Sequence, residues 1–152
     1  MKKNIFKTVA MLFIAFVLLS FSKGLGGEGF EIYVNGKVVL QQFGKNLNTV
    51  KHLQLNQNSP QDKITIRYHH CGKVGNNRTV TIKDDDNKLI KVWSYKDSKE
   101  PLGDMSCTVL DILKLTTGNN KVFKIYYASS ELPAGRMLTK LSFTKNSVAA
   151  RK

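Results

Sequence analysis

Residues 30–43, FEIYVNGKVVLQQF, contain the clearest fold signal in the chain. Two runs rich in β-branched and aromatic residues flank the Asn-Gly pair at 35–36. Both residues of that pair tolerate the positive φ that a type I′ turn requires at its two central positions. Pairing across the turn places Ile32 beside Val39, and apolar groups fall on both faces of the ribbon. The stretch therefore predicts a β-hairpin that is part of a larger β assembly.

Beyond this hairpin, the chain repeats the pattern of short strand and turn about every eight to twelve residues. The further expected strands cover residues 50–55, 63–70, 78–84, 88–95, 105–109, 121–129 and 136–143. A short helical turn is expected over residues 110–114, and ELPAG at 131–135 is expected to turn the chain into the last strand. About nine short strands and no long helix predict an all-β fold, an antiparallel β-sandwich of immunoglobulin-like type. A closed β-barrel is the alternative.

A short apolar segment lies near the start of the chain. TVAMLFIAFVLLSF, at residues 8–21, is uncharged and follows the lysine-rich start MKKNIFK. It is shorter than the ~20 apolar residues of a membrane-spanning helix. Small residues precede a cleavage point after Ser22, and a cut after Gly24 also fits, so a secretory signal peptide over residues 1–22 is predicted. An uncleaved N-terminal anchor is the alternative.

This prediction divides the chain into four parts. The signal peptide at 1–22 is followed by a flexible glycine-rich lead-in at 23–29, a β-sandwich domain at 30–143 and a basic tail at 144–152. The exported part has the length of one ordinary domain. We expect a periplasmic or secreted protein with no transmembrane segment after cleavage.

The charge of the chain is strongly basic. It has 24 Lys and Arg against 11 Asp and Glu, for a net charge of +13. Three lysines and no acid leave with residues 1–22, so the exported part carries +10. This favours an anionic partner: a glycan, a lipid surface or an acidic protein. Export separates the chain from the cell's genome, which disfavours nucleic acid. Because the lysines are scattered singly, a general solubilising surface is the competing interpretation.

The only two cysteines are Cys71 and Cys107, and both belong to the exported part. An even pair in an oxidising compartment predicts a disulfide between them. Closing a loop of about 36 residues would stabilise the fold by roughly 3–4 kcal/mol. Two unpaired thiols are the alternative.

Histidines beside Cys71 raise the possibility of a metal site. His69, His70 and Cys71 are consecutive, and His52 is on the preceding strand, so nitrogen and sulfur ligands for zinc or copper are available. Adjacent residues of a strand point to opposite faces, so only one of the pair can join His52. Ordinary strand-end histidines are the favoured interpretation, and no cofactor is expected.

Two other features have a functional and a structural interpretation. The DDDN sequence at 84–87 could supply oxygen ligands to calcium, but it lacks the glycine and distal glutamate of the helix–loop–helix calcium loop, which favours a solvated turn. Trp93 and Tyr95 share a strand face that could stack on sugars or bases, although the alternation with polar residues favours the core. Tyr126 and Tyr127 must face opposite ways, so one of them is expected at the surface.

A resemblance covers nearly all of the predicted domain. FEIYVNGKVVLQQF, YHHCGKVGNNRTVTIKD and FKIYYASSELPAGRML together resemble small exported bacterial proteins of unassigned function. The resemblance runs from about Phe30 to Phe143. It implies export and a compact β domain, and it transfers no functional residue.

The sequence contains no GxSxG, HExxH, P-loop or Rossmann motif. This favours an exported, non-catalytic binding or interaction module of the envelope or extracellular space. A small envelope enzyme or metal-handling protein that uses His52, His69, His70 and Cys71 is the alternative. The candidate binding residues are Lys73, Arg78, Arg136 and whichever of Tyr126 and Tyr127 is exposed.

Overall fold

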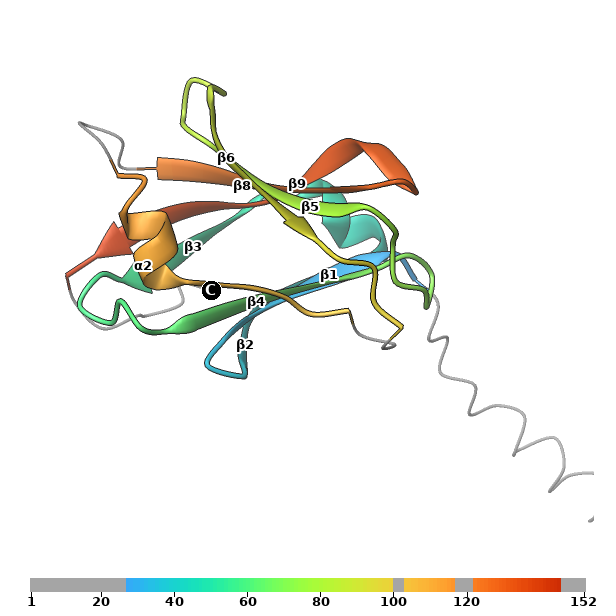
Figure 1. Cartoon of the computed structure of the whole chain (residues 1–152), viewed down its shortest axis with the longest axis horizontal. Coiled ribbons are helices and arrows are strands. Elements are labelled where there is room, and N and C mark those ends of the chain that lie inside the picture. The colour runs from blue at the N-terminus through green and yellow to red at the C-terminus, as the bar shows by residue number, and fades with distance from the viewer. Residues whose placement is uncertain (1–26, 100–102, 117–121, 146–152) are drawn as a thin grey trace, which may run out of the picture.

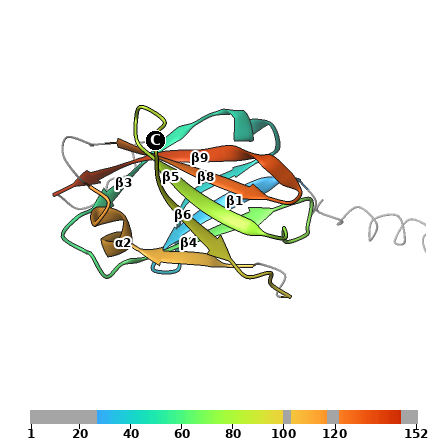
Figure 2. The ribbon, with the colours of Figure 1, turned by 45° about the horizontal axis from the view of Figure 1, so that its top comes forward.

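Two β-sheets stack face to face in the computed structural model, which describes residues 27–99, 103–116 and 122–145 (Figure 1). The four-stranded sheet has the order β2 (Lys37–Phe43), β1 (Gly29–Val34), β4 (Lys63–His69), β7 (Met105–Thr108). The five-stranded sheet has the order β3 (Lys51–Asn56), β9 (Leu132–Thr144), β8 (Val122–Ser129), β5 (Arg78–Lys83), β6 (Leu89–Tyr95). The two layers are also distinct in the rotated view (Figure 2). The predicted sandwich is therefore confirmed over the described residues, where neither sheet closes on itself.

Part of the predicted domain organisation lies outside the described residues. This applies to the signal peptide at 1–22, most of the lead-in and residues 146–152 of the basic tail. At the edges of the domain, β1 already begins at Gly29 and β9 extends to Thr144. Among the helices that the structure describes, none is long and apolar enough to cross a membrane.

The first hairpin has the predicted turn but not the full predicted register. Asn35 and Gly36 both have positive φ, 50° and 78°. Beyond the first pairs the ladder is irregular, and Ile32 lies opposite Leu40, so the predicted pairing of Ile32 with Val39 is wrong. The physical reason is a bulge, which adds one residue to β2 and turns Leu40 toward the core.

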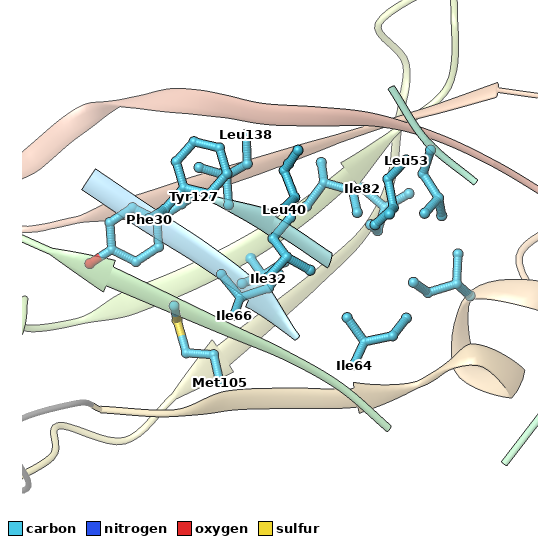
Figure 3. Packing of buried hydrophobic residues seen from close by; sticks show 14 of the residues in the cluster. Phe30, Ile32, Leu40, Leu53, Ile64, Ile66, Ile82, Met105, Tyr127 and Leu138 are labelled. Atoms are coloured by element: carbon cyan, nitrogen blue, oxygen red, sulfur yellow. The ribbon is translucent and has the colours of Figure 1, made fainter. Parts of the chain in front are cut away.

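The core lies between the sheets and is formed by the alternate residues of each strand. In β8 the alternation is complete: Phe123, Ile125 and Tyr127 are buried, and each residue between them is partly exposed. Ile32 and Ile66 meet them from the four-stranded sheet (Figure 3). Each such side chain contributes about 1.5–3 kcal/mol when it is buried fully.

The connection from β2 to β3 carries the chain from one sheet to the other. It is a 3₁₀ helix, η1 (Gly44–Asn48), which buries Leu47. The Gln42 amide donates to the carbonyls of Asn46 and Thr49 and so closes this segment. Beyond this crossing, β3 pairs in parallel with β9, whereas the other strand pairs in the described residues are antiparallel.

The predicted helical turn is present as α2 (Val109–Leu113). Thr108 caps its start: the hydroxyl accepts a hydrogen bond from the Asp111 N–H, and the Asp111 carboxylate accepts one from the Thr108 N–H. The bonds that the Asp111 carboxylate accepts from the Thr108 N–H and the Thr108 hydroxyl lower the pKa of Asp111. The Thr-x-x-Asp spacing is a capping-box signal that could have located the helix start from sequence.

The predicted turn at residues 131–135 is wrong. The chain reverses between Ser129 and Leu132, and β9 already includes Pro133. The β8–β9 ladder is irregular at this point, and Gly135 takes a φ of +69°. Such an irregularity accepts a proline that cannot donate to a ladder, so the strand begins earlier than the sequence suggested.

The predicted disulfide is also wrong, because both cysteines are free. Cys107 lies in β7 opposite Ile64, at the start of β4, whereas Cys71 follows the end of that strand at His69. The strand from Ile64 to His69 separates these two levels by roughly 17 Å, whereas a disulfide needs α-carbons within about 7 Å. The even number of cysteines predicted a bond, and the length of β4 prevents it.

The two thiols should react at very different rates. Cys71 is exposed, whereas burial raises the pKa of Cys107 to about 12. Since the thiolate is the nucleophile, we expect native protein at pH 8 to take up one iodoacetamide label rapidly, at Cys71. Unfolded protein should take up two. Mass spectrometry of intact and digested protein measures both. Rapid double labelling of the native protein would contradict the buried position of Cys107.

Candidate functional site

The histidines considered as metal ligands do not converge. His52 lies on β3 and contacts the Ser142 hydroxyl at 2.8 Å, while His69 and His70 project from opposite sides of the end of β4. His69 contacts Glu31, and His70 contacts Tyr127. The described residues contain no group of three His, Cys, Asp or Glu side chains placed to hold a metal ion. The metal-handling alternative therefore has no geometric support in this part of the chain.

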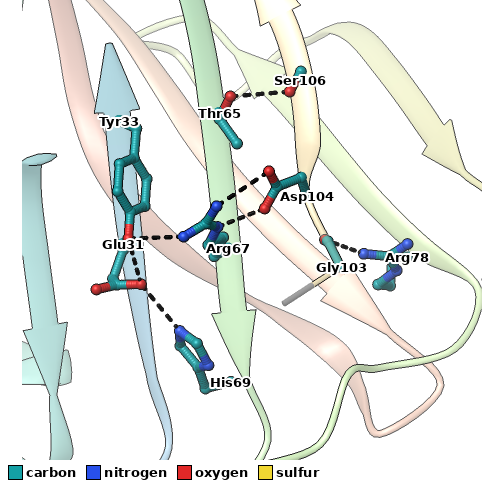
Figure 4. Close-up of polar contacts among 9 residues, drawn as sticks. All are labelled: Glu31, Tyr33, Thr65, Arg67, His69, Arg78, Gly103, Asp104 and Ser106. Atoms are coloured by element: carbon teal, nitrogen blue, oxygen red, sulfur yellow. Dashed lines mark hydrogen bonds and ion pairs between the residues drawn. The ribbon is translucent and has the colours of Figure 1, made fainter. Parts of the chain in front are cut away.

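His69 belongs to a polar network on the outer face of the four-stranded sheet (Figure 4). The Glu31 carboxylate accepts a hydrogen bond from the Tyr33 hydroxyl at 2.9 Å and lies 3.3 Å from His69. Arg67 donates to the same hydroxyl and makes two bonds to Asp104. The Arg67 guanidinium also lies over the Tyr33 ring, 4.5 Å from its centre.

The charged and polar groups of this network are paired with one another. The bond from Arg67 is the main reason that the pKa of Asp104 is lowered. Burial and the bond to Glu31 raise the pKa of Tyr33. Both shifts favour the protonation states that these hydrogen bonds require, an ionised Asp104 carboxylate and a neutral Tyr33 phenol. The arrangement thus links β1, β4 and the residue that precedes β7.

His70 belongs to a second cluster, at the end of the sandwich where β4 and β8 terminate. Its Nε2 lies 2.9 Å from the Tyr127 hydroxyl and 3.2 Å from the Ser129 hydroxyl. Burial lowers the pKa of His70. Gly75 packs against this group, because a Cβ there would lie 2.6 Å from the Tyr127 hydroxyl and 2.8 Å from His70 Nε2. The backbone of Gly75 therefore covers the polar atoms of the cluster.

Glu131 fastens the loop that contains Gly75. Its carboxylate accepts bonds from the backbone and the side-chain amide of Asn76, at 2.9 and 2.8 Å. The backbone bond is the largest reason that the pKa of Glu131 is lowered to about 2. The cluster around His70 is thus closed by a fixed loop, and we interpret it as structural.

The predicted binding residue Arg136 belongs to a third group, beside the stacked rings of Tyr68 and Tyr127. These rings lie 4.2 Å apart and nearly parallel. The Tyr68 hydroxyl donates to Glu28 at 2.6 Å, and Arg136 donates to both the Tyr68 hydroxyl and the Glu28 carboxylate. Arg136 is therefore already paired within the fold.

Arg78 was predicted as a loop contact, and its placement corrects that interpretation. It is the first residue of β5 and is only 3% exposed. Its guanidinium donates to the carbonyls of Lys96 and Gly103, and its Nε has no partner among the described residues. Arg78 thus joins the two ends of the connection from β6 to β7, and its burial makes it unavailable to a partner.

The other predicted binding residues also lie apart from one another. Lys73 is exposed in the loop between β4 and β5, Tyr127 is fully buried, and Tyr126 is the tyrosine of the pair that reaches the surface. Trp93 and Tyr95 pack against the edge of the core, as the structural interpretation of these rings expected. The predicted binding residues therefore do not form one site, but Tyr126 lies on a face with an unusual charge.

That face is the outer surface of the five-stranded sheet. Its five strands contain no aspartate or glutamate. Of their basic residues, Lys83, Lys124 and Lys140 have the outward register. The others, Lys51, Arg78, Lys91 and Arg136, are in register with core positions and do not belong to this face. Sequence reasoning noted the lysines individually and missed this segregation, which a count of acids per predicted strand could have indicated.

Three of these lysines are direct neighbours across the sheet. Lys83 on β5 lies opposite Lys124 on β8, which lies opposite Lys140 on β9. We call these three residues the lysine row. His52 on β3 continues it, opposite Lys140. Each has at least one buried core residue as its neighbour along the strand, so the four side chains point outward together.

The side chains of the lysine row diverge from one another. The Lys83 ammonium lies over the Tyr126 ring, 4.7 Å from its centre. The Lys124 ammonium donates to the Asp85 carbonyl at 2.6 Å and to the Asn87 side chain at 2.9 Å. The ammonium group of Lys124 therefore already uses oxygen atoms of the turn at 84–87. This favours the interpretation of these residues as a turn over the interpretation as a calcium site. Of the lysines in the described part of the chain, only Lys124 is ion-paired.

Comparison with known proteins gives little similarity. No protein-family model matches the chain, and no curated protein matches it. Among solved structures, the crystal structure of CopC from Methylosinus trichosporium OB3b aligns with a TM-score of 0.35 and 11% identity. The alignment covers 66% of this chain and 91% of that chain. A likeness at this level assigns no function.

Proposed function

We propose that this protein is an exported binding module for an anionic partner, and that the outer face of the five-stranded sheet is its binding surface. The lysine-rich start and the apolar run at residues 8–21 support export. The net charge of +13 supports attraction of anions in general. The surface itself is proposed from the lysine row.

The observation that carries the proposal is the alignment of Lys83, Lys124 and Lys140 in register. Like charges directly opposite one another destabilise a sheet. The five strands offer no carboxylate to offset this repulsion, and the acidic turn neutralises only Lys124. Fold stability by itself favours alternating charges here, so the row is better explained by an interaction with something outside the chain.

The position of the row also suits binding. The three lysines project from neighbouring strands in the body of a sheet, so their starting points are held rigidly. Lys83 and Lys140 remain without a carboxylate partner in the described residues. An anion bound at this face would therefore meet two ammonium groups that no carboxylate of the described residues neutralises.

A heparin column tests this proposal through its salt dependence. We expect the protein to be retained at low salt and released as salt rises, because screening weakens attraction between exposed charges. The double variant Lys83→Gln/Lys140→Gln should elute at clearly lower salt. Lys37→Gln/Lys63→Gln, on the other sheet, is the matched control, since it removes the same two charges.

Two outcomes would contradict the proposal. If both double variants shift equally, retention reflects overall charge and the lysine row has no special role. If the native protein is not retained, it has no affinity for this class of anion. Thermal unfolding provides a separate check: Lys140→Gln should leave the melting temperature unchanged or raise it, because it removes repulsion within the row.

A further inference from the structure

We infer that the anionic partner is a linear acidic glycan that lies across the strands along the lysine row. This inference rests on the proposed function, and it adds the shape, direction and chemistry of the ligand.

Register makes the row straight. Lys83, Lys124, Lys140 and His52 occupy matching positions on four adjacent strands. Adjacent strands are about 4.8 Å apart, so the line from Lys83 to His52 spans roughly 14 Å perpendicular to the strands. The backbone positions of the three lysines are therefore evenly spaced, and their long side chains can reach from these positions to acidic groups on successive units of an extended chain.

Hydrogen-bonding groups flank the row on both sides. In the direction of the β8 carboxyl end, Thr81 and Tyr126 are paired on adjacent strands. In the opposite direction, Ser142 and Gln54 are paired on β9 and β3. These uncharged hydroxyl and amide groups can bond the hydroxyls of sugar rings that carry the acidic groups.

The same face offers little to a lipid bilayer. Among the described residues, the large apolar side chains exposed in the five-stranded sheet are Leu89 and Val92, both on the edge strand β6. The four strands that carry the row and His52 have none. Membrane-surface binding combines basic groups with inserted apolar side chains, and this face supplies only the basic groups.

Asp85 sets one boundary of the site. Its side chain is 70% exposed and its carboxylate lies 3.8 Å from the Lys124 ammonium. It repels an anion that extends over the turn at 84–87, and so favours a ligand that follows the row. Removing this charge should therefore strengthen binding at the lysine row and have no such effect on binding elsewhere.

Calorimetric titration with oligogalacturonates tests the inference, because these chains carry one carboxylate on every sugar. We expect affinity to rise from the disaccharide to the tetrasaccharide, and to level off once the chain covers the row. Lys83→Gln/Lys140→Gln should weaken tetrasaccharide binding about five-fold, as expected for the loss of two exposed ion pairs. Lys37→Gln/Lys63→Gln should change it by less than about two-fold.

An acid-to-amide pair provides the second matched comparison. Asp85→Asn should tighten tetrasaccharide binding about two- to three-fold, the range of one exposed charge interaction. Asp97→Asn makes the same change of charge at the other end of the sandwich, where Asp97 accepts a bond from the Asn77 backbone. It should leave the affinity unchanged. Equal effects of the two substitutions would place the glycan away from the lysine row.

Vesicles of phosphatidylglycerol in phosphatidylcholine, and long-chain polyphosphate, form the competing arms. If either binds more tightly than the oligogalacturonates and responds to Lys83→Gln/Lys140→Gln, the glycan inference is overturned and the proposed anion-binding function stands. Length-independent binding of the oligogalacturonates would also overturn it. If no anionic probe distinguishes the two double variants, both the inference and the proposed function fail.

Discussion

Replacing Tyr127 by alanine should lower the free energy of unfolding by about 3–5 kcal/mol, the usual cost of truncating a large buried aromatic side chain. Tyr127 is fully buried between the sheets, and its ring stacks on Tyr68 at 4.2 Å. The substitution also removes the hydroxyl that lies 2.9 Å from His70. Urea unfolding followed by fluorescence or circular dichroism measures the difference.

The adjacent residue provides the control. Tyr126→Ala changes the same side chain one position earlier in β8, on the outer face, where the ring contacts Lys83. It should cost about 1 kcal/mol or less, the range of an exposed cation–π contact. Tyr127→Phe separates the hydroxyl from the ring and should cost about 1 kcal/mol. If Tyr126→Ala and Tyr127→Ala lower the free energy of unfolding equally, the assignment of Tyr127 to the inner face of β8 and Tyr126 to the outer face is wrong.

Arg78→Met should destabilise the protein by about 3 kcal/mol. The substitution preserves most of the apolar stem but leaves the carbonyls of Lys96 and Gly103 without their donor. The buried Gly103 acceptor without a partner costs about 1–3 kcal/mol, and the partly buried bond to Lys96 is lost as well. Because these carbonyls belong to the connection between β6 and β7, we also expect faster tryptic cleavage at Lys96 and Lys99.

Arg67→Met is the matched control for Arg78→Met. Arg67 lies on an outer face and bonds to Asp104, whose side chain is 46% exposed, so water can replace the lost donor. It should cost about 1 kcal/mol or less. If Arg78→Met leaves stability unchanged, the cost of burying an unpaired charge equals the contribution of its two hydrogen bonds. The two hydrogen bonds that Arg78 donates to Lys96 and Gly103 would then contribute no net stability.

Local patterns in the sequence predicted the fold class and most of its elements. The alternation of apolar and polar residues located the strands because side chains of a strand point to opposite faces in turn. The same rule predicted that Tyr126 and Tyr127 face opposite ways, and they do. The Asn-Gly turn was predicted because only a few residue types accept its backbone angles.

The candidate site was predicted less well. Basic charge and Tyr126 pointed to a binding surface, but Arg78 proved to be buried and Arg136 is paired with Glu28. Sequence reasoning treated basic residues near turns as exposed, although a guanidinium can reach backbone carbonyls across a connection. The predicted cysteine bond failed for a similar reason, since it ignored the strand that separates the two thiols.

The amino-acid sequence by itself determined where the strands and turns form, which faces of the strands are buried, and the excess of positive charge. These properties depend on backbone preferences and on alternation over a few residues. Only the tertiary structure decided that Lys83, Lys124 and Lys140 stand side by side, because their strands are paired across long stretches of chain. Strand pairing and register depend on how the two sheets bury their apolar faces against each other, and no local pattern contains that information.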